Sequence, residues 1–506
     1  MRFSRAVFFA ALADVAASQL VVSTDFKRVS FPPDLVQITR RDTFDVTAIN
    51  NLTGGGYYSE VEVGTPGQKM LMHLDTGSSD TWVVDKQADL CNSPRLQRTY
   101  GTGCTSTFDT TKSSTYELVT RNGFDITYLD ARNIQGDYIS DTVDINGKKV
   151  SSQQLGLAIQ TVKGSGLMGL GFSTGVSTRR SYPTILDNMV SQKLIGRKAF
   201  SLWLNDLSSS EGTLLFGGID TEKYIGSLTT LPLVDDYHSE RITSYSVAMT
   251  GVSLETPDGK MTELAAENFN ASTVLDSGST VCLLPDRIAN QIWEKYDVID
   301  AGYGFVDCKW RGPDGENHFL DFEFSGVTIR VPLEEMVLDN LDPIMDQLEG
   351  LLPFDNPCMF GIQSNSAFDI NSSRFALLGD TFLRSAYVVY DETNQQVGIA
   401  QANLNSTRSN VIELRADETA LPTATGVACQ VSTAAPTRTA SGSTGGSGGG
   451  GRESGSGATS ILATPTPSAT ENAASRPGMA PLGFDGTIVA ALTSVFAILG
   501  AALLAV

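Results

Sequence analysis

Histidine and cysteine are scarce in this chain. Its 506 residues include three histidines and six cysteines. The motif HExxH, which places two zinc-binding histidines on one helix face, is absent, and no two cysteines have the CxxC spacing. These absences argue against a zinc protease and against a redox or zinc-thiolate site. We therefore expect neither a metal ion nor another cofactor.

Positive charge is also in short supply. The chain has 36 lysines and arginines against 57 aspartates and glutamates, which leaves a formal net charge of −21. Proteins that bind nucleic acid draw on clustered cations, so this balance argues against a nucleic-acid partner. The acidity suits an acidic extracellular medium, and it is equally compatible with a surface that is simply soluble.

The sequence does contain one short motif in two copies. Residues 74–79 read LDTGSS and residues 275–280 read LDSGST, and each copy follows an apolar, strand-like run. One such motif alone is an ordinary turn, and two unrelated surface turns are the alternative interpretation. The repetition instead indicates two lobes that each supply one carboxylate, Asp75 and Asp276.

Two carboxyl groups a few ångström apart repel each other when both are ionised, so such a pair shares one proton. The ionised member can take a proton from a bound water while the protonated member hydrogen-bonds a peptide carbonyl. Gly77 and Gly278 lack a Cβ atom, which lets the backbone turn tightly and the aspartates approach each other. The nearby hydroxyl groups are suited to orienting the carboxylates; they belong to Thr76, Ser78, Ser277 and Ser279.

With these motifs the chain resembles the pepsin-like aspartic peptidases. Residues 166–171 (GLMGLG) are similar to the apolar loop that passes beneath the first aspartate in that family, and residues 376–384 (ALLGDTFLR) are similar to its partner in the second lobe. Residues 212–220 (GTLLFGGID) are similar to the strand and turn before the lobe crossover. The resemblance covers residues 50–405. It implies a bilobal, all-β fold with the active-site cleft between the two lobes.

The local patterns agree with a mainly β protein. Residues 57–63 alternate between apolar and polar side chains, and residues 386–390 and 397–400 flank a hairpin turn. Helical patterns are few, and the better ones lie at residues 183–193 and 285–296.

The resemblance also implies a flap, a hairpin that closes over the substrate. Tyr128 matches the tyrosine of the family's flap, and Trp82 matches the tryptophan that hydrogen-bonds it. The glycine that usually follows the tyrosine is Leu129 here, and the tip continues with Asp130. We expect Trp82, Tyr128 and Asp130 to contact substrate, with plain core packing as the alternative for the two aromatic residues.

The cysteines fit the same family. The resemblance implies one disulfide within each lobe, Cys91 with Cys104 and Cys308 with Cys358. Cys282 lies in an apolar run and is expected to be a buried thiol, whereas Cys429 has no obvious partner.

The amino terminus has the pattern of a secreted precursor. Residues 1–18 form a signal peptide with a basic start, an apolar middle and small residues before the cut. The dibasic pair Arg40 and Arg41 resembles a kexin-type processing site, so residues 19–41 are expected to be a short propeptide. We place the N-terminal lobe at 42–225 and the C-terminal lobe at 226–410.

The carboxyl terminus has the pattern of a lipid anchor signal. Residues 411–487 form a stalk rich in Ser, Thr, Gly and Pro, and residues 488–506 are uncharged and apolar. A small-residue triplet that starts at Asn472 precedes the tail, as in a GPI signal, and Asn472 is the expected attachment residue. An ordinary tail anchor is the alternative.

We therefore expect a secreted aspartic endopeptidase, monomeric and bound by GPI to the plasma membrane or cell wall, as in the fungal yapsin group. Its substrates would be proteins or peptides, cleaved at acid pH. The alternatives are an inactive relative that binds peptides or wall polymers in the same cleft, and a structural wall glycoprotein.

Two finer expectations complete the sequence analysis. An acidic run in the second half favours basic residues in the substrate; it comprises Glu334, Glu335, Asp339, Asp342, Asp346 and Glu349. Asn-X-Ser/Thr sequons predict N-glycosylation; they start at Asn51, Asn270, Asn371 and Asn405.

Overall fold

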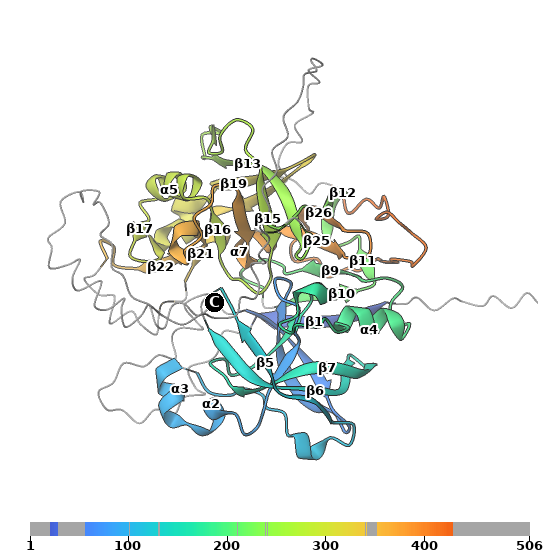
Figure 1. The fold of residues 1–506 in the computed structure, drawn as a ribbon. Helices are drawn as coiled ribbons and strands as arrows, with labels where there is room; N and C mark the ends of the chain where they lie inside the picture. The colour runs from blue at the N-terminus through green and yellow to red at the C-terminus, as the bar shows by residue number, and fades with distance from the viewer. Residues whose placement is uncertain are drawn as a thin grey trace, which may run out of the picture.

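The computed structural model describes residues 21–28, 56–100, 102–129, 132–209, 211–237, 239, 241–339, 341 and 352–428. β-Strands dominate this part of the chain, and the α-helices are short (Figure 1). The helices are α2 (Asp89–Asn92), α3 (Pro94–Tyr100), α4 (Ile185–Ser191), α5 (Asp286–Lys295) and α7 (Asp380–Leu383). The two better helical patterns of the sequence, at 183–193 and 285–296, correspond to α4 and α5.

The strands of the first half are β1 (Val22–Arg28), β2 (Tyr57–Val63), β3 (Gln68–Asp75), β4 (Trp82–Val84), β5 (Glu117–Thr127), β6 (Asn133–Ile145), β7 (Lys148–Gln160), β8 (Gly166–Gly169), β9 (Ala199–Trp203), β10 (Glu211–Phe216), β11 (Gly218–Asp220) and β12 (Tyr224–Pro232). Those of the second half are β13 (Ser246–Glu255), β14 (Met261–Glu263), β15 (Ala271–Leu275), β16 (Cys282–Leu284), β17 (Ile299–Asp300), β18 (Gly304–Asp307), β19 (Phe319–Phe324), β20 (Val327–Pro332), β21 (Val337–Leu338), β22 (Pro357–Phe360), β23 (Ile362–Ser364), β24 (Phe375–Leu378), β25 (Ala386–Asp391), β26 (Gln396–Ala402) and β27 (Val411–Glu413).

The strands form two lobes that share one large sheet. A 13-stranded sheet has the order β12-β26-β25-β9-β10-β1-β2-β3-β8-β4-β7-β6-β5, and an eight-stranded sheet contains β20-β19-β13-β15-β24-β16-β23 with β14 beside β13. Smaller sheets are β17-β18-β22-β21 and β11-β27. In Figure 1 strands β5, β6 and β7 of the first half lie below and the second half lies above with β12 beside β26, while β9, β10 and β1 run along the boundary. The structure thus has the bilobal, all-β fold that the resemblance implies.

The two halves repeat one strand arrangement around their aspartate motifs. In the first half β3 runs parallel to β8 and pairs Asp75 with Gly169, while β4 pairs antiparallel with β8. In the second half β15 runs parallel to β24 and pairs Leu275 with Leu378, while β16 pairs antiparallel with β24. Each motif therefore lies at the end of an interior strand in which alternate residues are buried.

Aromatic side chains hold the boundary between the halves. Phe200 of β9 and Tyr390 of β25 stack with ring centroids 4.8 Å apart, and Tyr245 meets Tyr390 edge-on at 4.8 Å. Beside them the buried Arg197 and Asp391 form an ion pair at 3.3 Å. Such aromatic pairs contribute beyond their buried area, so this cluster fixes how the halves meet.

Two segments outside the predicted lobe limits also take part in the sheets. β1 falls within the predicted propeptide, yet it pairs with β10 and β2 inside the large sheet. Residues 411–428 fall within the predicted stalk, yet β27 pairs with β11 and the amide of Gly426 donates to Gly226 at 2.6 Å. The folded region is therefore longer at both ends than the segment 42–410.

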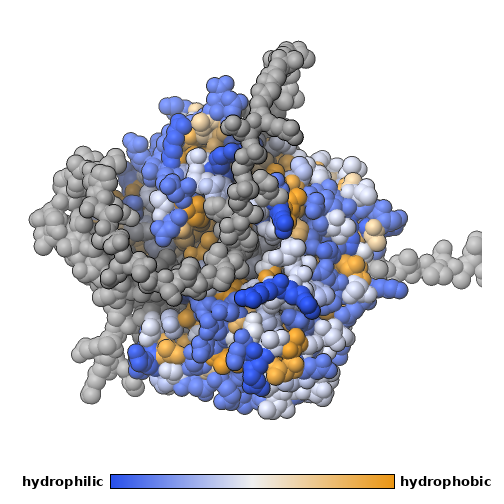
Figure 2. Space-filling model, in the orientation of Figure 1, coloured by the Kyte–Doolittle hydropathy of each residue, from blue (hydrophilic) through white to orange (hydrophobic). Residues whose placement is uncertain are grey.

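Several predicted features lie outside the described residues: the signal peptide, the dibasic pair, Asn51, Asp130, Cys429, Asn472 and the apolar tail. Within the described residues, no helix is long and apolar enough to span a membrane. Figure 2 shows a mainly hydrophilic face with small, separate apolar patches on the described surface. The sequons at Asn270, Asn371 and Asn405 are exposed.

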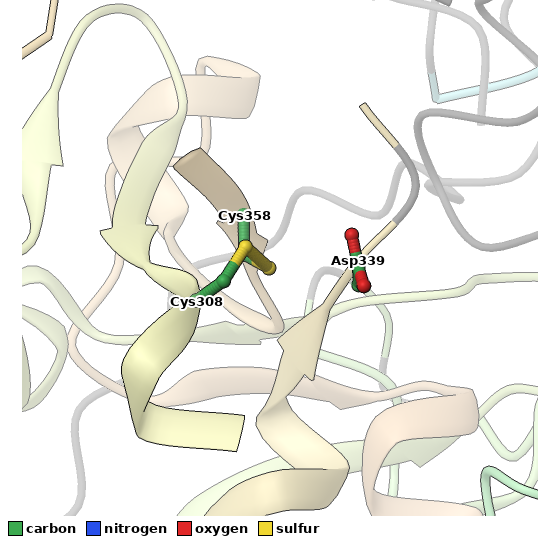
Figure 3. Close-up of side chains that lie close together, drawn as sticks. All are labelled: Cys308, Asp339 and Cys358. Carbon is green, nitrogen blue, oxygen red and sulfur yellow. A yellow bond between two sulfur atoms is a disulfide. The ribbon is translucent and has the colours of Figure 1, made fainter. Parts of the chain in front are cut away.

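The structure joins Cys91 to Cys104 and Cys308 to Cys358. Asp339 lies beside the second bridge (Figure 3), but both sulfur atoms are committed to the disulfide and are not available as thiolate ligands for a metal. Cys282 is a buried thiol, and burial raises its pKa to about 11, so it stays protonated.

The two bridges should contribute unequally to stability. They close loops of 13 and 50 residues, and a longer loop loses more entropy in the unfolded chain when it is crosslinked. We expect the Cys91→Ser/Cys104→Ser variant to lose about 3 kcal/mol and the Cys308→Ser/Cys358→Ser variant about 4 kcal/mol of unfolding free energy. Urea denaturation measures both, and a larger loss from opening the short loop would contradict the expectation.

Candidate active site

The two aspartate motifs meet between the lobes. Asp75 ends β3 and Asp276 follows β15, and the two residues are 5% and 7% exposed. A Cβ atom added to Gly77 would lie 2.5 Å from Asp276 Cγ, and one added to Gly278 would lie 2.3 Å from Asp75 Oδ1. Any larger residue at either position would therefore displace the opposite carboxylate, which explains the two glycines.

Each carboxylate is held by its own motif in the same way. Asp75 Oδ1 accepts from the amides of Gly77 (2.8 Å) and Ser78 (3.1 Å), and its Oδ2 accepts from Ser78 Oγ (2.5 Å). Asp276 Oδ1 accepts from the amide of Gly278 (2.8 Å), and its Oδ2 accepts from Ser279 Oγ (2.7 Å). These hydrogen-bond donors fix the planes of both carboxylate groups before any substrate binds.

The third residue of each motif reaches across to the other lobe. Thr76 Oγ1 donates to the carbonyl of Leu275 (2.8 Å), and Ser277 Oγ donates to the carbonyl of Leu74 (3.0 Å). Each hydroxyl also accepts from the opposite backbone amide: Ser277 N lies 2.9 Å from Thr76 Oγ1, and Thr76 N lies 3.2 Å from Ser277 Oγ. Four buried hydrogen bonds thus set the separation of the two carboxylates.

The pair favours retention of one proton. Burial, and then the neighbouring charge of Asp75, raise the pKa of Asp276 well above its usual range, and the hydrogen bonds from Ser279 and Gly278 only partly oppose this. The titration belongs to the pair as a unit. At acid pH the site therefore presents one proton on two adjacent carboxyl groups.

A hairpin made by β5 and β6 extends over this site. Tyr128 follows β5, and its amide donates to the carbonyl of Arg132 at 2.9 Å. Trp82 Nε1 donates to the hydroxyl of Tyr128 at 2.8 Å, which is the contact the resemblance implies. The next residue, Leu129, is 41% exposed and lines a pocket together with Gly77 and Asp276.

The pocket beside Asp276 is formed mostly by the second half of the chain. Its other lining residues are Asp236, Tyr237, Thr243, Ser244, Ser246, Val274, Phe375 and Leu377. The aliphatic and phenylalanine residues of the lining come from β15, β24 and Leu129, and the hydroxyl-bearing residues come from the segment 237–246. This composition suits an extended peptide with mixed side chains.

Three charged residues near the site were not singled out from the sequence. Asp80 is buried behind the first motif and accepts from the hydroxyls of Tyr138 (2.8 Å) and Tyr182 (2.6 Å). Asp236 accepts from Ser246 Oγ (3.3 Å) and from Ser244 Oγ, and burial raises its pKa. Lys163 lies over the ring of Tyr128. Only Asp80 carried a local signal, its position directly after the first motif.

Two residues of the acidic run in the second half form ion pairs. Glu335, in the 3-10 helix Leu333–Met336, is buried and pairs with Arg384. Asp339 lies 3.6 Å from Arg311. Glu334 is exposed, and Asp342, Asp346 and Glu349 lie outside the described residues.

Comparison with known proteins decides the family. A model described as eukaryotic aspartyl protease matches residues 56–402. The chain belongs to this family. It is 36% identical over 429 residues to a probable aspartic-type endopeptidase opsB of Aspergillus fumigatus, which covers 81% of this chain and 82% of the relative. It is 31% identical over 393 residues to candidapepsin of Candida tropicalis, which covers 76% of this chain and 89% of the relative. It is 32% identical over 385 residues to secreted aspartic protease 8 of Candida albicans, which covers 73% of this chain and 81% of the relative. The protein is an aspartic endopeptidase, with protein or peptide substrates.

The raised pKa of Asp276 predicts a pH-dependent stability. A carboxyl group whose folded pKa is raised contributes stability below its unfolded pKa and loses it as the pH rises through the folded value. We expect the free energy of unfolding to fall between about pH 4 and neutrality, and Asp276→Asn to weaken this fall because the amide does not titrate. Urea denaturation across this range measures it, with the exposed Asp314→Asn as control. An equal fall in wild type and Asp276→Asn would contradict the expectation.

Proposed function

We propose that Asp75 and Asp276 together activate a water molecule that attacks the scissile peptide bond. The observation that carries this proposal is the pair of buried carboxylates, each fixed by its own motif and tied to the other by the Thr76 and Ser277 hydrogen bonds. The ionised carboxylate accepts a proton from the water, and the protonated carboxyl donates a hydrogen bond to the substrate carbonyl. The carboxyl group that took the proton from the water then donates it to the amide nitrogen as the C–N bond breaks, so the tetrahedral species gives an acid and an amine without a covalent intermediate.

The flap residues are proposed to exclude water and hold the substrate. Trp82 positions the hydroxyl of Tyr128, and Leu129 faces the pocket beside the dyad. Closure of such a hairpin strengthens electrostatic interactions within the cleft by removing solvent. Tyr128 thus affects binding and closure, while proton transfer stays with the dyad.

Replacement of either aspartate should abolish turnover. Asp75→Asn and Asp276→Asn keep the side-chain shape but remove a group that can share the proton, so we expect kcat to fall by about three orders of magnitude or more. Tyr128→Ala should reduce the rate less, and pepstatin, a mimic of the tetrahedral species, should inhibit. Hydrolysis of denatured protein by purified enzyme from about pH 2 to 7 should follow a bell-shaped curve.

Asp314→Asn serves as the matched control for this experiment, because it makes the same chemical change at an exposed residue of the 3-10 helix Pro313–Gly315. Full activity in either dyad variant would overturn the mechanism. A wild-type protein that binds peptide but cleaves none would support the alternative, an inactive peptide- or wall-binding glycoprotein.

We also propose that the protein is a secreted, N-glycosylated precursor that reaches the cell surface and is held there, as a monomer, by GPI. The apolar tail, the small-residue site at Asn472 and the stalk support this assignment to the yapsin-type group, and the name of the Candida albicans relative supports secretion. Cleavage after Arg41 would separate β1 from the mature chain, so β1 is part of the proposed precursor.

The anchor is tested by truncation. A chain that ends at Glu471 lacks the proposed signal, so we expect active enzyme in the medium, whereas deletion of the glycine-rich run 445–451 keeps the signal and should leave the enzyme on the cell. Phosphatidylinositol-specific phospholipase should release the second form. Resistance to the lipase, together with a C-terminal peptide that still ends at Val506, would show that the tail is not exchanged for lipid.

The proposed preference for basic substrate residues has a different candidate source from the one expected. Glu335 and Asp339 have cationic partners of their own, whereas Asp236 lines the pocket beside Asp276. A carboxylate at this place would attract a lysine or arginine side chain of the substrate once it is ionised. We therefore assign any basic preference to this pocket.

A further inference from the structure

One cation lies directly against the flap tyrosine. Lys163 belongs to the loop between β7 and β8, is half-buried, and places its Nζ atom 4.7 Å from the centroid of the Tyr128 ring. The hydroxyl of the same ring accepts from Trp82 Nε1. The ammonium group therefore faces the electron-rich surface of the ring, the geometry of a cation–π interaction.

The fold fixes the loop that carries this cation. Thr161 Oγ1 donates to the carbonyl of Lys163 (2.9 Å) and accepts from its amide (3.1 Å), while the amide of Thr161 donates to Asp89 Oδ1 (3.0 Å). The carbonyl of Gly164 accepts from the amide of Thr105 (2.8 Å). The loop is thus tied to the backbone on both sides of Lys163.

Gly164 shows how closely the loop packs on the disulfide segment. A Cβ atom there would lie 1.8 Å from the carbonyl oxygen of Gly103, the residue before Cys104. The segment that contains the Cys91–Cys104 disulfide therefore packs against the loop. This packing fixes the backbone position from which the Lys163 side chain extends.

The positive charge of Lys163 affects the pKa of a histidine near the dyad. His73 lies on β3 two residues before Asp75, and its pKa is lowered to about 3, first by burial and second by the charge of Lys163. His73 is therefore neutral at about pH 5.5, and Lys163 supplies positive charge on this side of the site.

We propose that Lys163 is a specificity-determining residue of the cleft. At the substrate position that packs against Tyr128, it disfavours lysine and arginine and favours an acidic or neutral side chain. Asp236 lines a pocket built largely from the second half of the chain, so the cleft carries charges of opposite sign at two places. This inference rests on the proposed function, because it assumes that substrate lies beneath the flap.

The test measures kcat/KM for a set of peptides. Each peptide carries Glu, Gln, Leu or Lys at one position on either side of the cleaved bond and is otherwise identical to the others. At about pH 5.5 a glutamate side chain is mostly ionised. For the position next to Tyr128 we expect wild-type kcat/KM to be about tenfold higher with Glu than with Lys, the size of effect that about 1.4 kcal/mol produces. Lys163→Met should remove this ratio, Lys163→Glu should invert it, and Lys163→Arg should retain it.

Lys148→Met is the matched control. Lys148 is exposed at the far end of β6 and β7 from the flap tip, so the same change in charge there should leave every ratio unchanged. Lys163→Arg also guards against misfolding, because it keeps the charge and the ring contact.

Three outcomes would overturn the proposal. The first is an unchanged Glu-to-Lys ratio in both Lys163→Met and Lys163→Glu. The second is a uniform fall in kcat for all peptides, which would mean that Lys163 only positions Tyr128. The third is the same shift in Lys148→Met. Failure of the wild type to cleave any peptide faster than Asp75→Asn would instead refute the proposed function itself.

Discussion

The structure depends on one exchange of hydrogen bonds between the two aspartate motifs. Thr76 and Ser277 each donate to the carbonyl that precedes the opposite aspartate and accept from the opposite amide. These four bonds hold together two carboxyl groups that repel each other whenever both are ionised. Because all four are buried, losing one partner would leave a backbone or hydroxyl group unsatisfied, which typically costs about 1–3 kcal/mol. The geometry of the dyad is therefore a property of the lobe contact and belongs to neither lobe alone.

The two lobes support this contact with the same backbone and different side chains. Behind the first motif, Asp80 accepts from two tyrosines and from the amide of Ser177 at 2.6 Å. Behind the second motif, Thr381 donates to the carbonyl of Gly361 at 3.0 Å and meets the thiol of Cys282 at 3.3 Å. The strand arrangement is thus repeated, whereas an aspartate accepts the hydrogen bonds behind one motif, and a threonine hydroxyl and a thiol meet behind the other.

The dyad could be predicted from the sequence because its partners lie within short local motifs. Site features that depend on contacts between residues far apart in the sequence could not be predicted. Asp75 and Asp276 carry their glycine and hydroxyl partners within three residues, and Trp82 and Tyr128 stand at recognisable distances from the first motif. The role of Glu335 was misjudged because its partner, Arg384, is 49 residues away and is buried with it. Lys163 and Asp236 lie on loops whose patterns reveal nothing about the cleft.

The chain ends show the same limit. Residues 22–28 have a strand pattern too weak to outweigh a processing site downstream, and only the register with β10 and β2 reveals their place in the large sheet. Residues 411–428 directly precede the Ser- and Gly-rich part of the chain and fall within the predicted stalk. Their anchoring points, buried Leu414 and Leu421, are single residues that composition does not distinguish.

The buried carboxyl groups point to one working range for both catalysis and folding. Burial raises the pKa not only of Asp276 but also of Asp80, Asp236 and Glu392. In acid these groups can stay protonated without the cost of a buried charge, and they become unfavourable together as the pH rises. The net charge of −21 adds repulsion in the same direction, because it develops fully only near neutrality. The acid range that leaves one proton on the dyad is therefore also the range in which the surrounding fold is under the least electrostatic stress.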